Sequence, residues 1–93
     1  MSKLPCRVYL GIDYHSQFCT VCLMDAEGKV LFQDVCGNTG DYLVKYLQWR
    51  IPGVQEVHAA IEACGGAAQL ADDLRRRGWQ VELAHAGYVS NLR

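Results

Sequence analysis

Two acidic residues, each following an apolar run rich in β-branched side chains, are the best candidates for chemistry. Asp13 ends the run 7–13, and Glu62 directly follows the run 54–61. If these runs are neighbouring parallel strands, their carboxyl ends meet at one edge of a sheet and bring the two carboxylates together. Paired carboxylates repel each other unless they are protonated or share a cation, and Mg²⁺ and Mn²⁺ prefer such oxygen ligands. The pattern indicates half of a divalent-metal site, of the kind that two-metal nucleases use.

The same acids have a simpler interpretation. An acid after a strand is commonly a turn former or the cap of the next helix. Two acids at the ends of two apolar runs are a more specific coincidence than either acid alone. The pattern by itself nevertheless leaves both interpretations open.

Seven segments must position these acids. Strands are expected at 7–13, 18–24, 30–35, 54–61 and 79–84. The five-residue connection 25–29 contains Gly28 and joins the second and third strands as a hairpin.

Helical spacing of apolar residues predicts two helices. Asn38 or Thr39 caps the first, which ends before Pro52. The second covers 67–77, with Gly78 as its left-handed cap. The remainder, 85–93, is expected to be a loop and the opening turn of another helix.

The order β-β-β-α-β-α-β predicts a mixed sheet. The first three strands form a meander, and the fourth and fifth run parallel to the first, which gives the spatial order 3-2-1-4-5. This is an α/β arrangement of the RNase H-like type. It places Asp13 beside Glu62.

Composition describes one small globular domain. The 93 residues are 51% hydrophobic and 20% charged, with a net charge of −1, so no basic field indicates nucleic-acid binding by electrostatics alone. No apolar stretch is long enough to span a membrane. The five cysteines are an odd number, and Cys19 and Cys22 lie three apart on an expected strand, where they point to opposite faces. We therefore expect structural thiols and no zinc or disulfide framework.

Three stretches resemble one protein family. The segments 10–16 (LGIDYHS) and 21–30 (VCLMDAEGKV) are similar to the opening of DEDD-type insertion-sequence transposases, the insertion sequence one-ten group. The segment 60–66 (AIEACGG) resembles the second acidic motif of that family, and 77–89 (RGWQVELAHAGYV) resembles the strand and helix start that follow. One departure is Ala86, where relatives often have proline.

The resemblance implies the N-terminal RuvC-like domain of a transposase that cuts and joins DNA strands with Mg²⁺ or Mn²⁺, two ions in the complete site. Asp13 matches the first acid of the family and Glu62 the second. The third and fourth acids are then expected beyond position 93, so that 1–93 is a single, incomplete and by itself inactive domain. The implied partners are DNA, a structured guide RNA and further copies of the chain. The implied location is the cytoplasm of a bacterial type of cell, with no membrane attachment.

Other polar groups have structural interpretations that are at least as good. The cluster 75–77 is basic, but cations are favoured at a helix C-terminus. Gly65 and Gly66 could approach a phosphate or simply pack closely. His15 is expected at the rim of the site. The tyrosines and tryptophans fit core or interface packing better than base stacking.

Two alternatives to the transposase remain. An actin-like kinase or ATPase also opens with an apolar strand ending in Gly-Ile-Asp, but needs small residues after the acid, where Tyr14 and His15 are bulky. A non-catalytic remnant or interaction module of the same fold is the other alternative.

Overall fold

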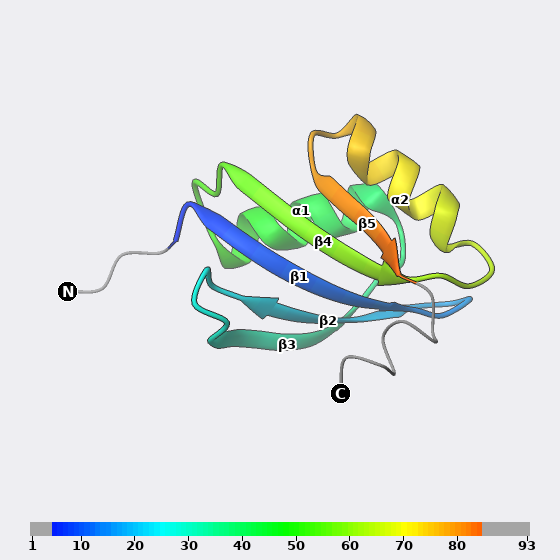
Figure 1. Cartoon of the computed structure of the whole chain (residues 1–93), viewed down its shortest axis with the longest axis horizontal. Helices are drawn as coiled ribbons and strands as arrows, with labels where there is room; N and C mark the ends of the chain where they lie inside the picture. The colour runs from blue at the N-terminus through cyan, green and yellow to red at the C-terminus, as the bar shows by residue number, and fades with distance from the viewer. Residues whose placement is uncertain (1–4, 85–93) are drawn as a thin grey trace.

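The computed structural model describes residues 5–84, in which a five-stranded sheet carries both helices on one of its faces (Figure 1). In chain order the elements are β1 (Arg7–Tyr14), β2 (Cys19–Met24), β3 (Val30–Cys36), α1 (Gly40–Arg50), β4 (Glu56–Glu62), α2 (Ala67–Arg76) and β5 (Gln80–Ala84). The strands lie in the order β3-β2-β1-β4-β5, as the sequence predicts.

Strand directions also agree with the prediction. β1 pairs antiparallel with β2, and β2 pairs antiparallel with β3, which makes the expected meander. β4 is parallel to β1 and to β5. A right-handed crossover through each helix puts α1 and α2 on the same side of the sheet, and the two helices contact each other.

The main differences from the predicted bounds are at element ends. β4 begins at Glu56 and not at residue 54, because the Val54 N–H donates to Ile51 O and closes a turn after α1. The α1 cap is Thr39, whose side chain accepts from the Tyr42 N–H. The loop and helix turn expected for 85–93 lie outside the described residues.

The core lies between the sheet and the helices. Every second residue of a strand points to the same face, and the buried set alternates in this way along the strands. From the sheet it includes Val8, Leu10, Ile12, Cys19, Val21, Leu23, Val57, Ala59, Ile61 and Val81. From the helices it includes Leu43, Tyr46, Leu47, Leu70, Ala71 and Leu74. We call this side the covered face.

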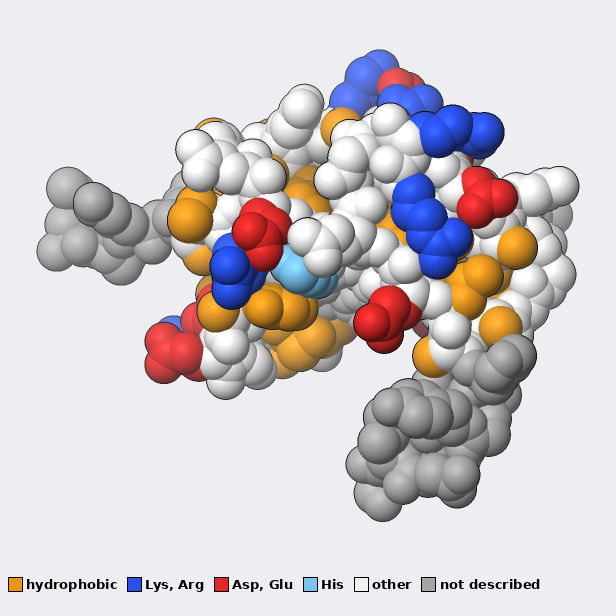
Figure 2. Space-filling model, turned by 45° about the horizontal axis from the view of Figure 1, so that its top comes forward, with side chains coloured by type: hydrophobic (Ala, Val, Ile, Leu, Met, Phe, Trp, Pro, Cys, Tyr) orange, Lys and Arg blue, Asp and Glu red, His pale blue; other side chains and the backbone are white. Residues whose placement is uncertain are grey.

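The other side of the sheet has no helix over it among residues 5–84, and we call it the open face (Figure 1). Its residues are the alternate ones of the same strands, and their side chains are small, polar or aromatic. They include Tyr9, Gly11, Asp13, Thr20, Cys22, Gln33, Val35, His58, Ala60, Glu62 and Glu82. Basic side chains gather elsewhere, over α2 and the adjacent strand β5 (Figure 2).

Candidate carboxylate site

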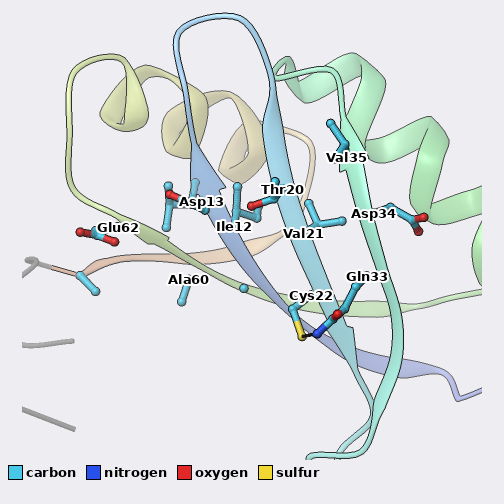
Figure 3. A pocket seen from close by; sticks show the side chains of 13 residues that line it. Ile12, Asp13, Thr20, Val21, Cys22, Gln33, Asp34, Val35, Ala60 and Glu62 are labelled. Carbon is cyan, nitrogen blue, oxygen red and sulfur yellow. Dashed lines mark hydrogen bonds between the residues drawn. The ribbon is translucent and has the colours of Figure 1, made fainter. Parts of the chain in front are cut away.

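Asp13 and Glu62 directly follow the last residues that are paired between the neighbouring parallel strands β1 and β4. β1 and β4 are in register from Arg7 opposite Glu56 to Ile12 opposite Ile61. The next residue of each strand is the acid, and both acids are exposed. They line one hollow of about 730 Å³ on the open face (Figure 3). The structure therefore brings the two predicted residues to one edge of the sheet.

The alternation of the strands turns both carboxylates outward. Ile12 and Ile61 are 4% and 0% exposed, because they pack under the helices. Their successors must point to the other face, where solvent or a cation can reach them.

Small side chains make the hollow beside the acids. Gly11 and Ala60 lie opposite each other in the register, directly before the two isoleucines. A Cβ added to Gly11 would meet nothing within 4 Å, so the space above the strand is open. The floor of the hollow is therefore backbone and methyl groups, and its polar character comes from side chains at its edge.

No described basic residue neutralises either carboxylate. Within residues 5–84, no Lys or Arg lies within 4.0 Å of Asp13 or Glu62, although five other acids form such ion pairs. Among the described residues, the side-chain hydrogen-bond partner of Asp13 is an imidazole, at 3.1 Å from Oδ2 to His15 Nε2. His15 thus lies at the rim of the site, where the sequence predicts it. Two carboxylates at one edge of the sheet, without a Lys or Arg partner among residues 5–84, are an arrangement that a bound cation would stabilise.

The donor set fits a hard divalent ion in part. Carboxylate oxygens are ligands that Mg²⁺ and Mn²⁺ prefer. Among the described residues, however, no group of three or more His, Cys, Asp or Glu side chains is arranged to hold a metal. Two carboxylates are too few to complete the coordination shell of such an ion.

The two members of the Cys-x-x-Cys pair lie on opposite faces of the sheet. Cys19 is buried on the covered face and Cys22 is on the open face, so the Cys-x-x-Cys pair is split between the two sides, as predicted. All five thiols are free. Burial raises the pKa of Cys19 to about 12 and that of Cys36 to about 11, which disfavours the thiolate form that binds metals and attacks disulfides.

The basic cluster at the end of α2 is used within the molecule. Arg75 donates to Val81 O at 2.7 and 3.1 Å and to Asp72. Arg77 donates to Asp73 at 3.2 Å. The Arg75 bonds to Val81 O attach the end of α2 to β5, and the bonds to Asp72 and Asp73 stay at the end of the helix, which favours the structural interpretation of the cluster.

Gly66 permits close packing. Its φ is +89°, and a Cβ there would lie 2.6 Å from the Tyr14 hydroxyl. The start of α2 therefore packs against the last residue of β1, next to Asp13. Close approach of backbone to side chain accounts for this glycine without a phosphate.

The sequence did not single out Asp34, which is the best-satisfied acid of the chain. Tyr46 donates to it at 2.5 Å, and Arg50 donates at 3.1 and 3.2 Å. These bonds hold the pKa of Asp34 below its usual value. Tyr46 and Arg50 lie four apart on α1, so they share a helix face, but only the packing of α1 on the sheet shows which strand they meet.

Comparison with known proteins identifies the family. The family model of the IS110-type DEDD transposases, described as a transposase, matches residues 10–93. The chain belongs to this transposase family. The match includes Asp13, Glu62 and nearly all of the sheet. It confirms the predicted family and favours a transposase over an actin-like kinase.

No curated protein matches the transposase chain. In residues 5–84, no helix is both long and apolar enough to cross a membrane. At the level of the family, the match indicates a transposase, an enzyme that acts in DNA transposition.

Proposed function

We propose that this chain is the RNase H-like, metal-binding N-terminal part of a DNA transposase. In this proposal Asp13 and Glu62 supply two of the carboxylates that hold Mg²⁺ or Mn²⁺. The observation that carries it is the position of both acids at the end of neighbouring parallel strands, on the open face and without a Lys or Arg partner among the described residues.

The sheet supports the RNase H-like assignment. An antiparallel meander followed by two parallel strands in the order β3-β2-β1-β4-β5 is the arrangement that we expect for this fold. It places the ends of β1 and β4 side by side at the centre of the sheet. A residue held at a strand end is positioned more precisely than one on a loop.

The residues have distinct tasks in this proposal. When bound, divalent ions would stabilise the attacking and leaving oxygens of a phosphodiester during cutting and joining. Asp13 and Glu62 hold and orient these ions, and the apolar covered face beneath them keeps both strand ends fixed. The two remaining acids of the DEDD set would come from another part of the full-length transposase. DNA is the proposed substrate, with a structured guide RNA and further copies of the chain as partners in the bacterial cytoplasm.

Titration with Mn²⁺ tests the carboxylate site, with free Mn²⁺ measured by electron paramagnetic resonance. The unmodified chain should bind Mn²⁺ weakly, because two carboxylates are only part of a coordination shell. Asp13→Asn and Glu62→Gln should each abolish this binding, since each removes one of the two charges.

Glu82→Gln is the matched control. Glu82 is an exposed acid of β5 that points to the same open face. Glu82→Gln changes the charge of the open face by the same amount as Asp13→Asn or Glu62→Gln, but it should leave Mn²⁺ binding intact. Identical titration curves for the unmodified chain, Asp13→Asn and Glu62→Gln would contradict the proposed function and favour a non-catalytic module.

A further inference from the structure

The turn after β1 holds an imidazole against Asp13. His15 Nε2 lies 3.1 Å from Asp13 Oδ2. Because an ionised carboxylate can only accept hydrogen bonds, Nε2 is the donor. The bond occupies one carboxylate oxygen and leaves the other available.

Contacts on three sides fix the position of His15. Its ring stacks on Phe18, with the centroids 4.5 Å apart and the planes 23° from parallel. Its backbone N–H donates to Phe18 O at 2.9 Å, which closes the turn between β1 and β2. Its backbone carbonyl accepts from Asn38 Nδ2 at 2.7 Å, which ties the turn to the loop before α1.

Core packing does not explain this arrangement. The His15 side chain is 43% exposed and Phe18 is 40% exposed, so the stacked pair lies on the surface. Little apolar area is removed from water, and the stability gained from burial is correspondingly small. The stack, the closed turn and the bond from Asn38 instead direct the imidazole at one carboxylate.

The two acids of the site differ in their hydrogen-bond partners. Glu62 has no side-chain hydrogen bond or ion pair to any residue between 5 and 84, whereas Asp13 has the imidazole. A carboxylate held in one rotamer loses less conformational freedom when it binds an ion. Hydrogen-bond partners of metal ligands typically change metal affinity about 10–100-fold when removed.

We propose that His15 is a positioning residue for Asp13. It holds Oδ2 and presents Oδ1 to the cation, so that Asp13 is the prearranged ligand and Glu62 adjusts to the ion. This inference rests on the proposed function, because it requires that Asp13 is a metal ligand.

Mn²⁺ titration of two substitutions at one position tests the role. His15→Ala removes the donor and should weaken Mn²⁺ binding about 10-fold. His15→Gln keeps an N–H donor at similar reach and should recover most of the affinity. The thermal unfolding midpoints of both variants should stay close to that of the unmodified chain, since the side chain is on the surface. A purely structural residue would show the opposite pattern, with the midpoint lowered and the affinity unchanged.

Parallel titration of Asp13→Asn separates the two proposals. If Asp13→Asn loses Mn²⁺ and His15→Ala binds it normally, the positioning role is wrong and the carboxylate site stands. If Asp13→Asn binds Mn²⁺ normally, both proposals are overturned.

A further readout distinguishes positioning from direct ligation. If His15→Ala and His15→Gln lose affinity equally, and pulsed paramagnetic resonance of the unmodified chain shows nitrogen bound to Mn²⁺, His15 is a ligand and the positioning role is overturned. Absence of directly bound nitrogen, together with recovery in His15→Gln, supports positioning.

Discussion

The two faces of the sheet are made from alternate residues of the same strands, yet they have opposite characters. On β1, Val8, Leu10 and Ile12 face the helices and are almost fully buried. Gly11 lies between Leu10 and Ile12, and Asp13 follows Ile12; both belong to the open face. One strand therefore supplies both the core that fixes its position and the carboxylate that it positions.

Asp34 and Asp13 show the same contrast between the two faces. Asp34 turns toward α1 (Figure 3). Tyr46 and Arg50 of that helix donate hydrogen bonds to its carboxylate. The Arg50 guanidinium also stacks on Phe32, 4.2 Å from the ring centroid, so the partner of Asp34 is itself held in place. Asp13 is on the open face with an imidazole and no described Lys or Arg beside it. An acid whose charge is already matched stabilises the fold, whereas an acid whose charge is unmatched is available for a cation.

The largest expected effect is the loss of stability caused by a substitution on the covered face. Leu10→Ala removes a side chain that is 2% exposed and should lower the free energy of unfolding by about 2–5 kcal/mol, because it leaves a cavity under the helices. Val35→Ala on the open face, where the residue is 69% exposed, should change it by less than about 0.5 kcal/mol. Urea denaturation followed by circular dichroism measures both. Similar losses for the two variants would mean that the open face is also packed.

A second, smaller loss of stability is expected where the start of α2 packs against the end of β1. Gly66→Ala forces a side chain into a backbone with φ of +89° and toward the Tyr14 ring, and should cost about 1–3 kcal/mol of stability. Gly65→Ala is the control, because a Cβ there meets nothing within 4 Å. Thermal unfolding compares the two. An unchanged midpoint for Gly66→Ala would show that α2 does not pack on the end of β1 as described.

The smallest expected effect is the pH-dependent contribution of Asp34 to stability, compared with that of Asp13. Tyr46 and Arg50 hold the pKa of Asp34 below its usual value, so its contribution to stability is present above about pH 4 and is lost as the pH falls through the folded-state pKa. Asp34→Asn should therefore be less stable than the unmodified chain near pH 7, and the two should converge below about pH 4. Asp13→Asn should change stability by less than about 0.5 kcal/mol at neutral pH.

Urea denaturation at a series of pH values measures this difference. Glu56, whose pKa is lowered by its hydrogen bond with His58 and by Arg7, is present in every variant and cancels in the comparison. A larger loss for Asp13→Asn than for Asp34→Asn would contradict the assignment of structural and site roles.

Much of the fold could be predicted because it depends on local periodicity. Apolar residues alternate along the strands and recur at helical spacing in α1, and glycines with positive φ stand at residues 28 and 78, where the chain must turn. The strand order follows from topology rules, and it places Asp13 at the same edge of the sheet as Glu62. The boundary of β4 was less predictable, because the turn at Val54 depends on a hydrogen bond back to α1.

The sequence by itself determined the element order, the family and the pair of acids, since these depend on residue types and spacing along the chain. Only the tertiary structure decided which polar groups already have partners. Asp34 and Asp13 look alike in sequence, and the residues that distinguish them, Tyr46 and Arg50 for one and His15 for the other, reach them through helix packing and the closure of a turn. Whether an acid is free to bind a cation depends on such contacts in space.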